Sequence, residues 1–147
     1  MRLTLDANII VRAAIRPAGP AGAVLELATR PGNRFVLSQA ILDEVRRVLG
    51  YERIRKLSGF TPQEEDDFVS SLAELAEVIA VEDVPSVCSD PDDDVVVATA
   101  VAGGSDVLCT LDRHLRHPLV VAYCATHSIR VLTDLEVLTV LRKPKED

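Results

Sequence analysis

The sequence has no tryptophan and few aromatic residues, which make up 3% of its 147 residues. Because proteins that bind single-stranded nucleic acid often stack aromatic side chains on the bases, this composition argues against a stacking platform. The formal net charge is −7, from 16 basic and 23 acidic residues, and it argues against a uniformly basic binding surface. Any polynucleotide partner must therefore be held in another way.

Cysteine is also scarce, and long apolar runs are absent. Cys88, Cys109 and Cys124 are odd in number and have no CxxC spacing, so neither a disulfide framework nor a zinc site is expected. No apolar stretch is long enough to span a membrane, and the N-terminus lacks a secretory cleavage pattern. We therefore expect a cytoplasmic protein with one domain at residues 1–142 and a polar tail at 143–147.

Positive charge is missing from the middle of the chain. No Lys or Arg lies between Lys56 and Arg113, and this stretch holds 14 of the 23 acidic residues. The rest of the chain is net positive. Its densest group of cations, here named the basic strip, consists of Arg46, Arg47, Arg53, Arg55 and Lys56. The strip is either a solvated helix face or a surface that grips phosphates, and the sequence leaves both interpretations open.

The hydrophobic pattern predicts five short strands, at residues 3–5, 35–37, 78–81, 107–110 and 130–132. Helices are expected between them, at residues 9–15, after Gly22, and after an N-cap at Ser38. Two capping boxes, Thr61 with Glu64 and Thr133 with Glu136, predict the starts of two further helices. This alternation is typical of an α/β protein, a three-layer α/β/α sandwich whose parallel sheet is covered on both faces.

The segment SDPDDDVVVATAVAGG at residues 89–104 is ambiguous. Its run of valines favours a strand by propensity. Asp90 as N-cap, Pro91 at the first helical position and acidic residues in the first turn favour a helix instead. We predict a helix that ends at Gly103.

Four acidic residues follow four different predicted strands. Asp6 ends the first strand, Glu44 lies on the helix after the second, Asp94 begins the helix after the third, and Asp112 follows the fourth. In parallel α/β sheets, ligands collect at the carboxyl ends of the strands. Each acid alone is an ordinary turn or helix-start residue. Together, with no His or Cys companion, they predict a site for Mg²⁺ or Mn²⁺ rather than zinc.

The same positions resemble the motifs of the PIN domain ribonucleases, and in particular the VapC-like toxins of bacterial toxin–antitoxin pairs. Residues 5–9, LDANI, resemble the opening motif, with Asp6 as the first metal acid and Asn8 as its companion. Residues 37–45 resemble the second motif, which contains Glu44. DPDDDVVVATA resembles the third and TLD at residues 110–112 the fourth. Within the third motif the preferred acid is Asp94, while the register leaves Asp93 as the alternative.

The resemblance implies a five-stranded parallel sheet in the order 3-2-1-4-5. It also implies an Mg²⁺- or Mn²⁺-dependent endoribonuclease, a hydrolase that acts on RNA phosphodiesters as the toxin of a toxin–antitoxin pair. The implied partners are an RNA substrate, a cognate antitoxin protein and a second copy of the chain in a homodimer. The implied catalytic and metal-ligating residues are Asp6, Glu44, Asp94 and Asp112, with Asn8 and Thr110 as hydrogen-bond partners.

Two other functions fit parts of the pattern. A receiver-like signalling domain also gathers acids at strand ends and accepts a phosphoryl group on an Asp. Such a domain is expected to have its phosphoacceptor after the third strand and a Lys after the fifth, and this sequence has neither. An inactive PIN fold that acts only as an interaction protein is the other alternative, and the complete set of acids argues against it.

Overall fold

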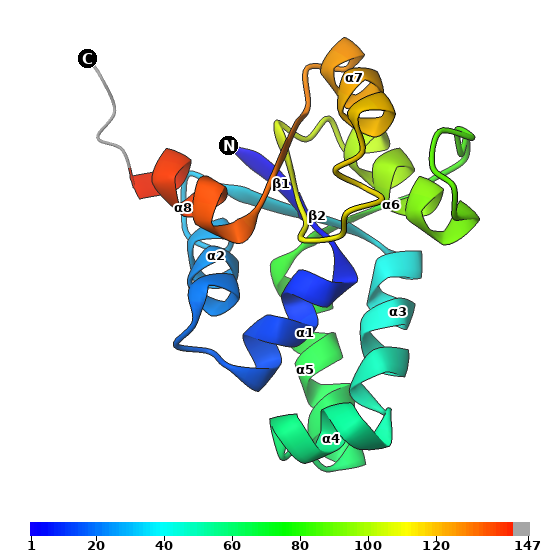
Figure 1. Cartoon of the computed structure of the whole chain (residues 1–147). Helices are drawn as coiled ribbons and strands as arrows, with labels where there is room; N and C mark the ends of the chain where they lie inside the picture. Colours follow the sequence, from blue (N-terminus) through cyan, green and yellow to red (C-terminus); the bar gives the residue numbers. More distant parts are fainter. Residues whose placement is uncertain (143–147) are drawn as a thin grey trace.

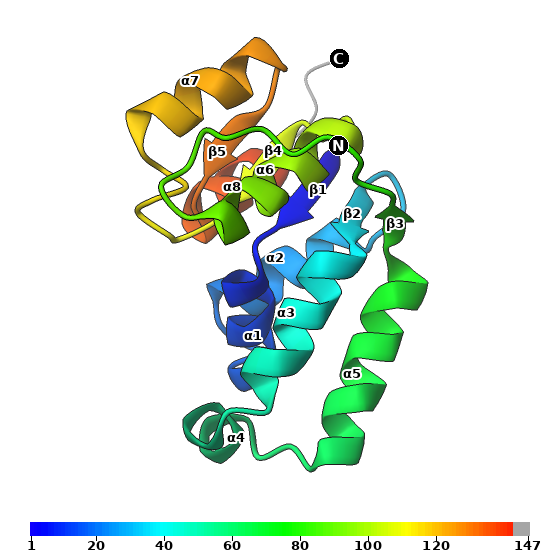
Figure 2. The same cartoon turned by 90° about the vertical axis from the view of Figure 1, so that its right-hand side faces the viewer.

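A computed structural model describes residues 1–142; the tail expected at residues 143–147 lies outside the described residues. All of the described strands join one parallel sheet in the order β3-β2-β1-β4-β5. They are β1 (Arg2–Leu5), β2 (Arg34–Ser38), β3 (Glu77–Ile79), β4 (Val107–Cys109) and β5 (Arg130–Leu132). Figure 2 shows this order from β5 on one side to β3 on the other. The predicted sheet and its strand order are confirmed.

Helices cover both faces of the sheet, which confirms the three-layer α/β/α sandwich. In Figure 1, α6 and α7 lie on one face of the sheet, and α2 and α8 lie on the other. The helices are α1 (Ala7–Ile15), α2 (Pro20–Ala28), α3 (Gln39–Leu49), α4 (Glu52–Ser58), α5 (Pro62–Leu75), α6 (Pro91–Ala102), α7 (Pro118–Thr126) and α8 (Asp134–Arg142). Two of these, α4 and α7, are absent from the elements that the sequence predicts.

The middle strand, β1, is hydrogen-bonded on both sides and buried on both faces. Its Leu3 and Leu5 are fully buried, as is Leu108 of the neighbouring β4. Strands covered on both faces are buried along their length rather than on alternate residues, and the LTL and VLC segments follow this rule, with the hydroxyl of Thr4 bonded to that of Ser105. The sheet core therefore fixes the point at which β1 ends, and the next residue is Asp6.

Helix starts follow the predicted caps, with one exception. Asp90 accepts a hydrogen bond from the amide of Asp92 and caps α6 despite the valine run. Both predicted capping boxes form. Ser38 is the N-cap residue of α3, as predicted, but its side chain does not cap the helix. Its hydroxyl lies 2.8 Å from that of Thr99 and makes no cap bond, because both groups are buried and satisfy each other.

Several boundaries differ from the predicted ones by one to three residues. Helix α2 begins at Pro20 instead of after Gly22, since proline at the first helical position needs no amide partner. Strand β3 ends at Ile79, not at residue 81, because it is an edge strand that pairs only with β2, and β2 ends opposite Ile79 at Ser38.

The sheet order also separates this fold from receiver domains, in which the order is 2-1-3-4-5. Within residues 1–142, no helix combines the length and the apolar character needed to cross a membrane.

Candidate functional site

Asp6 lies at the carboxyl end of the central strand and is the N-cap of α1. Its side chain is 6% exposed and accepts hydrogen bonds from the Thr110 hydroxyl (2.8 Å) and the backbone amide of Asn8 (3.4 Å). Burial raises the pKa of the Asp6 carboxyl, and so does the nearby Asp112 carboxylate, while the bond from Thr110 opposes the rise. Two hydrogen bonds therefore hold Asp6 in one orientation, at an electrostatic cost to its ionised form.

Thr110 connects Asp6 to Asp112. Its hydroxyl donates to Asp6 and accepts the backbone amide of Asp112 at 3.0 Å. The Asp112 carboxylate in turn accepts the amide of His114 at 2.7 Å. One fully buried threonine at the end of β4 thus fixes the loop that carries Asp112 relative to the acid at the end of β1.

The third motif presents Asp93, and not Asp94, to these acids. Asp93 is half-buried, and its pKa is raised to about 6 by burial and by the carboxylates of Asp112, Asp90 and Asp6. Asp94 is 5% exposed, and its carboxylate faces the loop before α6. It accepts the amides of Val87 (3.0 Å) and Cys88 (2.7 Å). Burial raises the pKa of Asp94, but these two amides, together with the Cys88 side chain, lower it more, so its net pKa is below the usual value.

Glu44 reaches the same site from the second turn of α3. Its carboxylate is bound by Arg47 one helical turn later, and both side chains are partly exposed. Asn8, in the first turn of α1, is exposed at the edge of the site. The structure therefore brings together Asp6, Glu44 and Asp112, as predicted, with Asp93 in the place expected for Asp94.

These residues line a cavity of 390 Å³, here named the acidic cleft. Seven acidic residues line it, with one cation, Arg47, and they are Asp6, Asp43, Glu44, Asp90, Asp92, Asp93 and Asp112. Among residues 1–142, no three acidic, His or Cys side chains are already grouped closely enough to hold a metal ion. The cleft thus concentrates negative charge without the carboxylates being drawn onto one point.

The basic strip is largely neutralised by ion pairs. Arg46 and Arg55 both bind Glu65, which is completely buried, and Arg46 also binds Asp66. Arg47 binds Glu44, and Lys56 lies 3.5 Å from Glu52. These contacts support the interpretation of a structural helix surface over that of a phosphate-gripping strip, because four of its five cations, all but Arg53, are already paired within the described part of the protein.

Comparisons with known proteins agree with this architecture. A family model described as PIN domain matches residues 2–114. Among solved structures, a similar chain comes from the crystal structure of VapBC2 from Rickettsia felis bound to a DNA fragment from their promoter. The TM-score is 0.60 at 15% sequence identity, and the match covers 90% of this chain and 98% of that chain. At this identity the likeness concerns the fold. No curated protein matches the chain.

Proposed function

The chain belongs to the PIN domain family, and from that premise we propose that it is an Mg²⁺- or Mn²⁺-dependent endoribonuclease. The observation that carries the proposal is the crowding of Asp6, Asp93 and Asp112 at the carboxyl ends of the strands. Burial raises the pKa values of Asp6 and Asp93, the carboxylate of Asp112 raises both further, and that of Asp6 adds to the rise at Asp93. Like charges held this close destabilise a folded protein unless a cation or a proton offsets them.

The donor atoms of the acidic cleft fit a hard divalent cation. They are carboxylate oxygens, with no His or Cys among the lining residues, and Mg²⁺ and Mn²⁺ prefer such ligands. In the proposal Asp6, Asp93 and Asp112 hold the metal, and Glu44 is either a further ligand or a base that orients water. When bound, such a cation activates water as a nucleophile and stabilises charge that develops on a phosphodiester.

The remaining groups of the cleft orient these acids. The Thr110 hydroxyl and the Asn8 amide hold the Asp6 carboxylate, so its oxygens keep a fixed direction. The His114 amide does the same for Asp112. Arg47 offsets the charge of Glu44 and stands at the cleft wall, where it can also meet a substrate phosphate.

The experiment is a cleavage assay of purified protein on a labelled single-stranded RNA, with Mg²⁺ or Mn²⁺ and with EDTA. We expect cleavage by the wild type with metal, none in EDTA, and a loss of at least about 100-fold in Asp6→Asn. Asp67→Asn is the matched control, because Asp67 is exposed and outside the cleft. Cleavage that persists in EDTA, or in Asp6→Asn at saturating metal, would refute the proposal.

We further propose that the chain is a cytoplasmic toxin with an antitoxin partner and that it forms a homodimer. The support for an antitoxin is the fold shared with a chain of a VapBC2 complex. The support for a dimer is apolar exposure on α7, where Leu119 is 70% exposed. The toxin proposal is tested by expressing the chain in bacteria, where we expect growth arrest that is relieved by a protein encoded beside it. The dimer proposal is tested by light scattering of the purified chain.

A further inference from the structure

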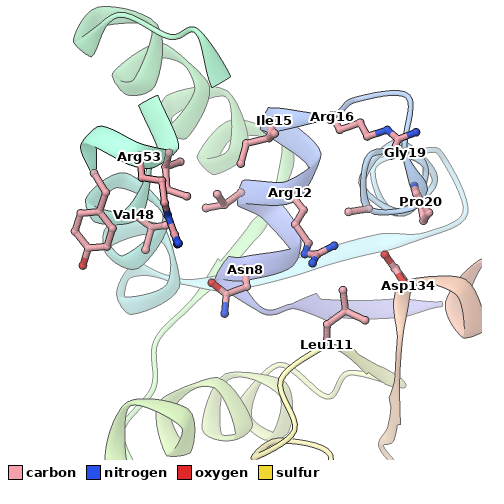
Figure 3. A pocket seen from close by; sticks show the side chains of 14 residues that line it. Asn8, Arg12, Ile15, Arg16, Gly19, Pro20, Val48, Arg53, Leu111 and Asp134 are labelled. Atoms are coloured by element: carbon pink, nitrogen blue, oxygen red, sulfur yellow. The ribbon is translucent and has the colours of Figure 1, made fainter. Parts of the chain in front are cut away.

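A second hollow lies beside the acidic cleft and has the opposite charge. It has a volume of 750 Å³ and is here named the arginine groove. Three arginines line it, Arg12 and Arg16 from the α1 end and Arg53 from α4, with one carboxylate, Asp134, whose side chain accepts the amide of Leu135. Figure 3 shows Arg53 on one side and Arg12 and Arg16 on the other.

These three arginines, of which Arg53 belongs to the basic strip, have no internal partner in the described part of the chain. Among residues 1–142, Arg12, Arg16 and Arg53 form no ion pair with any acidic side chain, whereas the other four cations of the strip all do. All three are exposed, so their charges face solvent within the groove. Unpaired cations gathered in one hollow attract an anionic ligand of complementary charge.

The groove is continuous with the acidic cleft. Asn8 lines both hollows. Val48 and Leu111 line the arginine groove, and their chain neighbours Arg47 and Asp112 line the acidic cleft. Asn8 and Arg12 lie four residues apart on the exposed face of α1, a rise of about 6 Å, and Arg16 follows as the C-cap residue at the end of the helix. A ligand that leaves the cleft over Asn8 therefore meets Arg12 and then Arg16.

The wall between the arginines is apolar, formed by Val11, Ile15, Val48 and Ile54, and Tyr51 stands at the side with 52% exposure. Cations beside an apolar surface suit single-stranded nucleic acid, because the phosphates bind the cations and the bases pack on the apolar surface. A purely acidic peptide would bind the arginines but would not pack on the apolar wall.

We propose that the arginine groove is the subsite for the RNA strand on one side of the scissile phosphate, with Arg12, Arg16 and Arg53 as its backbone-binding residues. The inference rests on the proposed ribonuclease function and adds where the substrate lies. It explains how a chain of net charge −7 holds a polyanion, because the cations needed are gathered in one hollow beside the acids.

The test is the binding of a labelled single-stranded RNA of about twelve nucleotides, measured by fluorescence anisotropy in EDTA between about 50 and 200 mM salt. In the triple variant Arg12→Gln, Arg16→Gln, Arg53→Gln we expect affinity to fall about 10- to 100-fold. The slope of log affinity against log salt should shrink by about 2, from three contacts at about 0.7 each. The matched control, Arg30→Gln, Arg34→Gln, Arg130→Gln, removes three exposed arginines outside the groove and should keep the slope.

An unchanged salt slope in the groove variant overturns the inference, as does an equal loss in the control. A groove variant that keeps its RNA affinity but no longer binds an oligo-glutamate peptide assigns the groove to an acidic protein partner and also overturns it. Metal-dependent cleavage by the wild type, measured on the same RNA, tests the proposed function separately. Melting curves of both variants check that they fold, which the exposure of all six residues favours.

Discussion

At the scale of single residues, Thr110 connects two acids of the cleft through one hydroxyl group. It is fully buried, and its one hydroxyl both donates to Asp6 and accepts the amide of Asp112. Losing that hydroxyl leaves a buried carboxylate oxygen and a backbone amide short of partners. Because unsatisfied buried polar groups are costly, the hydroxyl affects both stability and the geometry of the two acids.

We expect Thr110→Val, which keeps the shape of the side chain, to lower the free energy of unfolding by about 1–3 kcal/mol. It should also lower RNA cleavage, because Asp6 and Asp112 lose their shared anchor. Thr110→Ser keeps the hydroxyl and should retain most of the activity. Urea melts and initial cleavage rates measure the two effects, and full activity in Thr110→Val would show that the anchor is unimportant.

Asp93 and Asp94 are neighbours with opposite tasks. We expect Asp93→Ala to abolish metal-dependent cleavage and to leave the metal-free protein as stable or more so, because it removes a carboxylate repelled by Asp112 and Asp6. Asp94→Ala leaves the Val87 and Cys88 amides without their acceptor and should destabilise the fold by about 2–3 kcal/mol.

Thermal melts in EDTA and cleavage rates in Mg²⁺ measure the two variants side by side. The reverse result, in which Asp94→Ala loses activity while remaining as stable as the wild type, would return the ligand position to Asp94.

The acids of β1 and β4 could be predicted from sequence because a strand end is a fixed point of the sheet. The choice between Asp93 and Asp94 could not. Adjacent residues on a helix differ by about 100° in direction, and α6 is buried nearly all round, from Val96 to Ala100, so hydrophobic periodicity does not reveal which face points to the cleft. Nothing in the sequence separates Arg12, Arg16 and Arg53 from the paired arginines; only the tertiary structure does.

At the scale of elements, one buried carboxylate ties three helices together. Glu65 of α5 has no exposed surface and binds Arg46 of α3 and Arg55 of α4. Hydrogen bonds from Arg55 lower the pKa of Glu65 and more than offset the effect of its burial, and the charge of Arg46 adds to this. This clamp positions α4, the short helix that carries Arg53 to the arginine groove.

We expect Glu65→Gln to cost roughly 3 kcal/mol of stability, because it leaves two guanidinium groups without their buried counter-charge. The same variant should weaken RNA binding only slightly if the three groove arginines keep their places. Asp67→Asn, two residues along the same helix and exposed, is the control and should change stability by less than about 0.5 kcal/mol. Equal melting temperatures for the two variants would show that the clamp contributes little.

The two helices that were not predicted have few of the usual signals, although Pro118 begins α7. Helix α7 is apolar on most sides, with Leu119 and Val121 exposed, so no amphipathic stripe marks it, and its N-cap is His117, which is outside the favoured capping residues. Helix α4 has seven residues and a Tyr at its N-cap. Its one clear marker is Gly59, which ends it with a φ of 71°. By contrast, α6 was predictable because its cap and proline outweigh valine propensity.

At the scale of the whole molecule, negative charge is concentrated in the acidic cleft. The acidic cleft holds Asp6 and Asp93 with raised pKa values, whereas Glu65 and Glu77 elsewhere have lowered ones, caused first by hydrogen bonds from Arg55 and Arg2 respectively. The two groups act on stability in opposite directions as pH changes. A stability profile therefore separates the cleft from the rest of the fold.

In EDTA, folded Asp93 binds its proton up to about pH 6, whereas in the unfolded chain it releases it near pH 3.8. The folded protein then binds more protons in this window, so the free energy of unfolding should rise as pH falls from 7 toward about 5. Below about pH 4.5, Glu65 and Glu77, whose pKa values are lowered in the folded protein, begin to take up protons and lose their stabilising ionised form, so stability should fall. Urea melts across this range test the profile, and Asp93→Asn should flatten its upper part alone.

Divalent metal should replace the proton as the stabilising ligand at neutral pH. A cation that binds the folded cleft and not the unfolded chain adds about 2.7 kcal/mol at 100 times its dissociation constant. For a chain of this length that corresponds to a rise in melting temperature of roughly 5–10 °C. We expect Mn²⁺ to give this rise in the wild type at pH 7, a smaller one at pH 5, where Asp93 is protonated, and little in Asp6→Asn. Asp67→Asn should respond like the wild type. If Mn²⁺ raised the melting temperature of Asp6→Asn as much as that of the wild type, the metal would be binding outside the acidic cleft.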